Sequence, residues 1–275
     1  MPHTYQGDLA KMHTLLGDTV EYRLPVGKDF IELNPLLGKS FSLEYQGAIH
    51  CIHCGRKTKK SFSQGYCYPC FSSLAQCDMC IVKPEQCHFE QGTCREPDWA
   101  QDHCMQDHYV YLANSSGLKV GITRGTQIPT RWMDQGASQA IPIYRTQTRL
   151  LAGLVEVILK QHVNDKTDWR RMLKGMPEPV DLAAERERLN TEIAAELTKL
   201  RNEQGEQSIT FLPAEASVEI NYPVLEYPTK VSSFNFDKQP LVEGTLLGIK
   251  GQYLIFDKGV INIRKFGGYE VKASF

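Results

Sequence analysis

The sequence lacks any apolar run that approaches the roughly 18 residues a membrane-spanning helix needs. Its first residues, MPHTYQGDLAKMH, contain no apolar stretch of the kind that directs secretion. It also has no internal repeat and no low-complexity segment. These absences predict a globular, cytoplasmic protein with no membrane partner, and no pattern in the chain suggests a small-molecule organic cofactor.

The chain also has almost no net charge, −1 over 275 residues, so its overall charge does not indicate a polyanion partner. The distribution of charge says more. Residues 51–175 contain 16 Lys and Arg against 11 Asp and Glu, and both flanking regions are acidic. A basic centre is typical of a surface that binds nucleic acid, although an excess this modest also occurs in domains that only need to stay soluble.

Nine cysteines without a secretory signal are typical of metal ligands in a reducing compartment, not of disulfides. The first four form two CxxC knuckles, in CIHCGRKTKKSFSQGYCYPC. This spacing predicts a zinc ribbon held by Cys51, Cys54, Cys67 and Cys70. Four thiolates leave no coordination position for water, which indicates a structural site.

The other five cysteines, one more than a tetrahedral site needs, are Cys77, Cys80, Cys87, Cys94 and Cys104. We interpret them as a second zinc site held by Cys77, Cys80 and two of the remaining three. An iron–sulfur cluster uses the same thiolates and stays open as an alternative.

Residues 108–132, HYVYLANSSGLKVGITRGTQIPTRW, predict two strands joined by a turn, followed by the start of a helix. IPIYRTQT predicts a third strand, and LLAGLVEVILKQHV an apolar helix. Tyr111, Lys119 and Arg131 then lie on one small surface, and Glu156 comes from the apolar helix.

These four residues supply one of each group that phosphodiester hydrolysis needs. A carboxylate can hold a divalent ion that clamps the phosphate, and an arginine fork binds phosphoryl oxygens. A tyrosine, or a lysine of lowered pKa, can relay the proton of the attacking water. Taken singly, a Tyr in an aromatic strand or a Glu on an apolar helix is more often part of the core.

The arrangement resembles the GIY-YIG nuclease superfamily, and most closely its phage-type branch with a KIG motif. YVY at 109–111 stands for GIY and KVG at 119–121 for YIG, with Arg131, Glu156 and His162 in the two helices. The chain departs from the family in having Lys119 in place of the second tyrosine, and in a shorter interval from Arg131 to Glu156 than in the repair nucleases. The whole chain also resembles an uncharacterised bacterial and archaeal family of cysteine-rich, zinc-ribbon-containing proteins.

The resemblance implies a GIY-YIG-type endonuclease that acts on DNA or RNA, with Mg²⁺ or Mn²⁺ at Glu156. The implied catalytic residues are Tyr111, Lys119, Arg131 and Glu156. Further candidates for contacts with nucleic acid are Arg124, Arg145, Arg149, Trp169, Arg170 and Arg171. In the C-terminal segment, Tyr253, Arg264, Lys265, Phe266 and Tyr269 have the same chemistry.

The predicted fold class is α+β, with a zinc ribbon, a GIY-YIG-like module and a small β-barrel-like domain built from both termini. The expected divisions are 1–50, 51–104, 105–175, one long helix within 176–207, and 208–275. Two other functions stay open: a non-catalytic RNA- or ribosome-associated binding protein that keeps the fold, and a zinc-stabilised protein-interaction scaffold.

Overall fold

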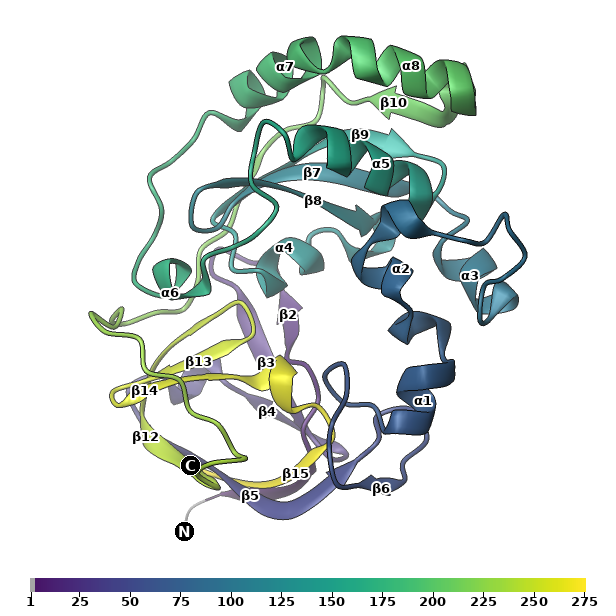
Figure 1. Cartoon of the computed structure of the whole chain (residues 1–275). Coiled ribbons are helices and arrows are strands. Elements are labelled where there is room, and N and C mark those ends of the chain that lie inside the picture. Colours follow the sequence, from purple (N-terminus) through teal and green to yellow (C-terminus); the bar gives the residue numbers. More distant parts are fainter. Residues whose placement is uncertain (1–2) are drawn as a thin grey trace.

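Antiparallel sheets dominate the computed structural model, which describes residues 3–275. Strands from the two chain ends form a terminal β lobe, residues 105–211 form a central lobe, and the cysteine-rich segment 51–104 runs along one side between them (Figure 1). The expected mixture of helices and sheets is confirmed. Within the described residues, every helix is too short or too polar to span a bilayer.

Both chain ends contribute strands to one sheet of the terminal lobe, in the order β1-β15-β5-β12-β13-β14 with β6 beside β5. These strands are β1 (Thr4–Asp8), β5 (Ser40–His50), β6 (Lys57–Thr58), β12 (Leu241–Lys250), β13 (Tyr253–Phe256), β14 (Gly259–Asn262) and β15 (Tyr269–Ser274). A smaller sheet contains β2 (His13–Leu15), β3 (Glu21–Val26) and β4 (Asp29–Glu32). Apolar residues of both sheets form one core, as expected for segments too short to fold alone.

The terminal lobe is not the closed barrel that the sequence predicts. β1 and β14 stand at the two ends of the strand order, and no strand of the described chain joins them. The turn between β3 and β4 packs on β1 instead, because Gly7 and Gly27 approach so closely that a Cβ on Gly7 would lie 2.5 Å from Cα of Gly27. The small sheet therefore covers an edge that closure of the barrel would need.

The central lobe contains the predicted hairpin, third strand and apolar helix. They are β7 (His108–Asn114), β8 (Leu118–Arg124), β9 (Gln139–Thr146) and α5 (Arg149–Leu159), with β10 (Ile209–Phe211), β11 (Val218–Glu219), α4 (Thr130–Asp134) and α6 (Trp169–Met172). Side chains alternate along β7. Val110 and Leu112 share a core with α5, whereas Tyr111 and Ala113 belong to the core of the terminal lobe.

The single long helix predicted within 176–207 is two helices, α7 (Leu182–Glu192) and α8 (Ala194–Gln204). The chain leaves the helical conformation at Ile193, whose side chain is fully buried. A straight helix of that length would extend to roughly 40 Å and run past the sheet. The bend keeps Leu189, Ile193 and Leu197 in one core, so the predicted apolar stripe is buried on the sheet and is not a free surface.

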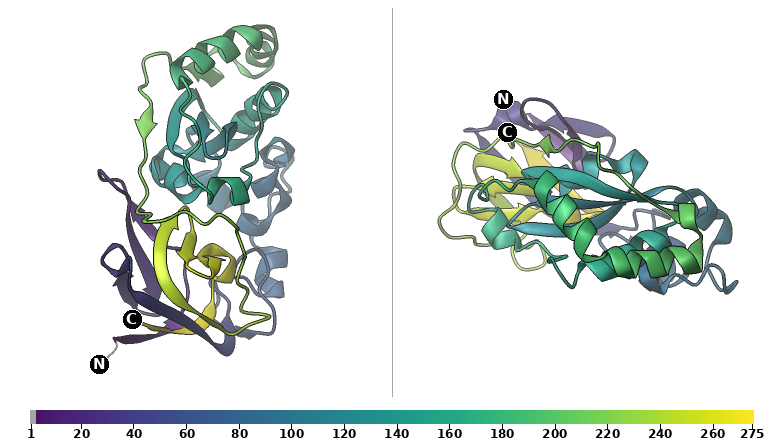
Figure 2. Two further views of the ribbon diagram at one scale, coloured as in Figure 1. Left: turned by 90° about the vertical axis from the view of Figure 1, so that its left-hand side faces the viewer. Right: turned by 90° about the horizontal axis from the view of Figure 1, so that it is seen from above.

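The cysteine-rich segment connects the two lobes along one edge of the molecule, as the side view in Figure 2 shows. Its helices are α1 (Tyr68–Ser73), α2 (Met79–Val82) and α3 (Pro97–His103), with 3₁₀ turns η2 (Ala75–Cys77) and η3 (Pro84–Gln86). The other 3₁₀ turns are η1 (Asn34–Leu36), η4 (Gly125–Gln127), η5 (Glu206–Ser208) and η6 (Ile263–Phe266). The segment thus lies beside both lobes.

We expect Phe41→Ala in β5 to destabilise the protein by about 3–5 kcal/mol, since the buried ring stacks at 6.4 Å on Phe256 of β13. Because these strands share a core, amide exchange in β13 should accelerate together with exchange in β5. Phe30→Ala, at a ring 52% exposed, is the matched control and should change stability little. Unchanged protection of β13 in the Phe41 variant would show that the two chain ends fold independently.

Candidate functional site

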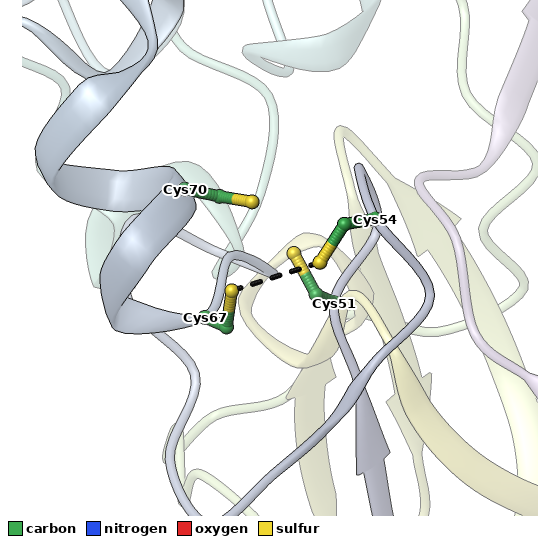
Figure 3. Close-up of side chains that lie close together, drawn as sticks. All are labelled: Cys51, Cys54, Cys67 and Cys70. Carbon is green, nitrogen blue, oxygen red and sulfur yellow. Dashed lines mark hydrogen bonds between the residues drawn. The ribbon is translucent and has the colours of Figure 1, made fainter.

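The first four cysteines form one compact group (Figure 3). Cys51 and Cys54 come from the turn after β5, and Cys67 and Cys70 from the start of α1. Their sulfur atoms lie within 4.8 Å of one another, and Sγ of Cys54 is 3.8 Å from Sγ of Cys67. Tetrahedral zinc with Zn–S bonds of about 2.3 Å places its sulfurs about 3.8 Å apart. The donor set and its spacing therefore fit zinc.

The local backbone also favours thiolates at this group. Gly55 adopts a positive φ of 71°, which allows the tight turn after the first knuckle. Burial by itself raises the pKa of the Cys51 thiol, but the backbone amides of Cys54, Cys67 and His53 point at its sulfur and lower that pKa to about 6. A thiolate is the form that binds a metal ion.

The predicted pairing of Cys77 with Cys80 is not present. Cys77 packs on the hydrophobic cluster around Cys51, whereas Cys80 lies in a separate group with Asp78 and His88. Between the two cysteines the backbone changes conformation: η2 ends at Cys77, Asp78 is extended, and α2 begins after it. The structure thus places Cys77 and Cys80 in separate groups, whereas the sequence was interpreted as pairing them.

Three of the four predicted catalytic residues line one cleft of about 770 Å³, bounded by the central lobe, the cysteine-rich segment and the terminal lobe. Lys119 comes from β8, Arg131 from α4 and Glu156 from α5. The fourth residue, Tyr111, does not line the cleft and lies directly behind its wall. Residues 37 positions apart in the sequence thus meet at one surface.

Tyr111 supports that wall from behind. Its side chain has no exposed surface, and its hydroxyl donates a hydrogen bond of 2.9 Å to Oε1 of Gln135. The hydroxyl lies against Gly121 on the paired strand, where a Cβ would approach it to 2.6 Å. Tyr111 pairs with Gly121 and Ala113 with Lys119, so Tyr111 and Lys119 share one face of the hairpin. The glycine of the KVG motif is therefore required by the tyrosine opposite it.

Lys119 is a buried cation, only 5% exposed. Across residues 3–275, its amine has no carboxylate within 4.0 Å, and the nearby acids pair with other groups. Burial, and after it the positive charge of Arg131, lower the pKa of the amine to about 8, although Glu156 and Asp165 act in the opposite direction. A lysine near neutrality in a cleft is a candidate for proton transfer.

Four arginines also line the cleft, and in the described chain none of them forms an ion pair with Asp or Glu: Arg124, Arg131, Arg149 and Arg264. The Nε of Arg149 is buried without a hydrogen-bond partner. Burial lowers the pKa of both Arg149 and Arg264, and the charge of Arg131 lowers both further. Buried positive charge that lacks a partner is unfavourable unless an anion binds beside it.

Glu156 is one of three carboxylates that line the cleft, together with Asp134 and Asp165. Asp134 forms an ion pair with Lys11. Glu156 is 3.3 Å from the amine of Lys160, which contacts Asp165 at the same distance. Burial raises the pKa of Glu156, and Lys160 counteracts this effect. Two carboxylates bridged by one lysine could also hold a divalent cation through their oxygens.

The remaining predicted contacts with nucleic acid lie away from the cleft, except Arg124 and Arg149. Arg145 borders a different hollow, next to Asp107. Trp169 stacks on Tyr253 at 5.6 Å in a buried cluster, Arg170 lies over its ring, and neither they nor Arg171 line the cleft. In the C-terminal segment, only Arg264 of the five candidates reaches the cleft, and Phe266 and Tyr269 are buried.

The comparisons with known proteins give one match. A protein-family profile with the description "Protein of unknown function (DUF2797)" matches residues 38–271. No curated protein and no solved structure matches the chain. The matched span includes all nine cysteines and every cleft residue discussed above apart from Lys11.

We expect Gly121→Ala to destabilise the protein by about 1–3 kcal/mol, because its methyl group would collide with the Tyr111 ring. In a Tyr111→Leu background the same substitution should cost little, which a double-mutant cycle of denaturant unfolding would measure. Gly175→Ala is the matched control, since no atom lies within 4 Å of its Cβ position. Equal costs of Gly121→Ala in both backgrounds would contradict the contact.

Proposed function

We propose that this chain, which belongs to the family described as "Protein of unknown function (DUF2797)", binds nucleic acid in the cleft and cleaves a phosphodiester bond there with a divalent metal ion. One observation carries the proposal. Lys119, Arg131 and Glu156 come from three separate elements and converge on a single cleft. Arg131 and Glu156 are of the residue type that the resemblance to GIY-YIG nucleases implies, and Lys119 corresponds to the lysine of the KIG motif in the phage-type branch.

The charges of the cleft support a phosphate ligand. Its lining includes Arg124, Arg131, Arg149 and Arg264, which lack carboxylate partners in the described chain. A guanidinium binds two phosphate oxygens in parallel and stays protonated even when burial lowers its pKa. A phosphodiester bound in the cleft would therefore supply the negative charge that these arginines lack.

The residues have separate roles in this mechanism. Arg131 holds the non-bridging oxygens of the scissile phosphate. Lys119, whose pKa of about 8 leaves part of its amine neutral near physiological pH, accepts the proton of the attacking water. Tyr111 is a positioning residue that keeps Gly121 and the β8 backbone in place. Glu156, near Asp165, would hold Mg²⁺ or Mn²⁺, and the ion would supply positive charge to the phosphate.

The geometry also supports a second candidate, binding of nucleic acid without cleavage. Tyr111 has no exposed surface, and Glu156 is engaged by Lys160. A metal ion would bind weakly to one such carboxylate and would need the substrate phosphate as a further ligand. The arginines that favour a bound polyanion are the same in both candidates, so only an activity measurement separates them.

We expect the protein to bind fluorescently labelled DNA or RNA oligonucleotides with an affinity that falls steeply as salt rises. Arg131→Ala and Arg264→Ala should each weaken binding by about 10- to 100-fold and lower the salt slope by about 1. Arg188→Ala is the matched control, because this exposed arginine on α7 already pairs with Glu185 and Glu192 at 2.7 Å. Salt-independent binding, or none, would favour the protein-interaction scaffold.

We expect Glu156→Gln to abolish cleavage in Mg²⁺ or Mn²⁺ while nucleic-acid binding stays the same or tightens, because the change removes the metal ligand and one negative charge. The measurement is release of labelled fragments from DNA and RNA, alongside the binding assay. Glu196→Gln, at an exposed position on α8, should cleave like the wild type. If the wild type binds DNA or RNA but cleaves neither, the proposed cleavage is wrong and binding without cleavage is supported.

A further inference from the structure

The stretch 78–107 has a defined conformation but almost no apolar core. None of the hydrophobic clusters found in residues 3–275 includes a residue from it. Two of its apolar side chains are exposed, Met79 at 58% and Val82 at 77%, and Ile81, Phe89 and Trp99 are only half-buried. Ordering the backbone costs about 1–2 kcal/mol per residue, which buried apolar surface normally offsets. A stretch this short and this poor in core needs another source of stability, such as a metal ion.

Polar contacts of their neighbours hold three of its cysteines in one region, where Cys80 lies in a group of possible metal ligands with Asp78 and His88. The carboxylate of Asp78 lies 2.7 Å from Nε of Arg95 and 3.5 Å from Nε2 of His88. Cys80 follows Asp78 by two positions, Cys87 precedes His88, and Cys94 precedes Arg95. The ends of the loop 87–95 are therefore held against the start of α2, next to Cys80.

Arg149 holds the fourth cysteine, Cys104, in the same region. The backbone amide of Arg149, at the start of α5, donates to the carbonyl of Cys104 over 2.9 Å. Its guanidinium donates to the carbonyl of Ile81 over 2.6 Å. Because Ile81 is the neighbour of Cys80, the chain around Cys104 is held close to the chain around Cys80.

We propose that Cys80, Cys87, Cys94 and Cys104 hold a second zinc ion, and that Cys77 is not a metal ligand. Four thiolates form a closed tetrahedral site, which is structural. Asp78 and His88 lie near it but have other partners, Arg95 and the hydroxyl of Thr93. They therefore support the loop around the ion and do not replace a sulfur.

The second zinc ion also shapes the nucleic-acid cleft. Gly153 of α5 lies so close to η3 that a Cβ there would approach Cβ of Pro84 to 2.7 Å. Pro84, Ile81 and Val82 line the cleft together with Lys119 and Glu156. The ion fixes α2 and η3 and thereby one cleft wall, but the site stands on the cysteines alone and does not depend on the proposed activity.

The test is elemental analysis of the purified full-length protein and three variants. We expect about two zinc ions per chain in the wild type and in Cys77→Ser, and about one in Cys87→Ser and Cys94→Ser. Two zinc ions in Cys87→Ser, or loss of one in Cys77→Ser, would overturn the ligand set. Iron in place of zinc, or one zinc in the wild type, would overturn the site.

A second measurement keeps the test decisive if the serine variants fail to fold. Mass spectrometry after alkylation of the native wild type should show Cys80, Cys87, Cys94 and Cys104 unmodified, since a bound thiolate is a poor nucleophile. After a chelator removes the zinc, all four should react. Reactivity of these four thiols that is the same with and without the chelator would also overturn the proposal.

Discussion

The structure depends on the position of β15, which lies between β1 and β5 and so joins both ends of the chain in one sheet. Since β5 also pairs with β12, residues 51–240 leave and re-enter the same sheet. At the point of departure, the amide of His50 donates to the carbonyl of Gly268 over 2.7 Å, immediately before Cys51. The pairing of β15 with β5 therefore fixes the position at which the first cysteine group begins. It also brings Arg264, four residues before Gly268, to the same corner.

The cleft at that corner combines features that oppose stability. Lys119 is buried, and the arginines around it lack carboxylate partners in the described residues. Protein interiors normally pair or neutralise such charges. They are tolerated here because rigid elements hold them: β8 is fixed by Tyr111 behind Gly121, and α5 is packed on the sheet. Partly buried charge without a partner is characteristic of sites that bind a ligand, which is why we propose the function at this cleft.

The two lobes and the cysteine-rich segment obtain their stability in different ways. Both lobes have extensive apolar cores, in which alternating side chains of the strands pack against helices or a second sheet. The cysteine-rich segment has only a small cluster around the first four cysteines. Metal ions in this segment would stabilise its conformation without an apolar core. This matters at the wall of the cleft, because a layer of apolar side chains there would disfavour a charged ligand.

The sequence alone was sufficient for the features that depend on neighbouring residues. The hairpin of β7 and β8 follows from apolar alternation and the NSSG turn, and the first four-cysteine group follows from two CxxC knuckles, since both are local in the chain. The shared face of Tyr111 and Lys119 follows from the strand register. The sequence also indicated that the chain ends share a sheet, because neither end alone could bury enough apolar surface.

Only the tertiary structure decided the features that depend on distant packing. Cys77 packs on the cluster around Cys51 whereas Cys80 groups with Asp78 and His88, and the CxxC spacing does not reveal that division. The break at Ile193 keeps this side chain in one core with Leu189 and Leu197, and the turn at Gly27 packs on Gly7 at the edge of the open terminal sheet. Arg264 and Lys11 join the cleft because the terminal lobe packs beside the central lobe. Such convergence depends on the three-dimensional arrangement of the lobes, which local residue patterns do not encode.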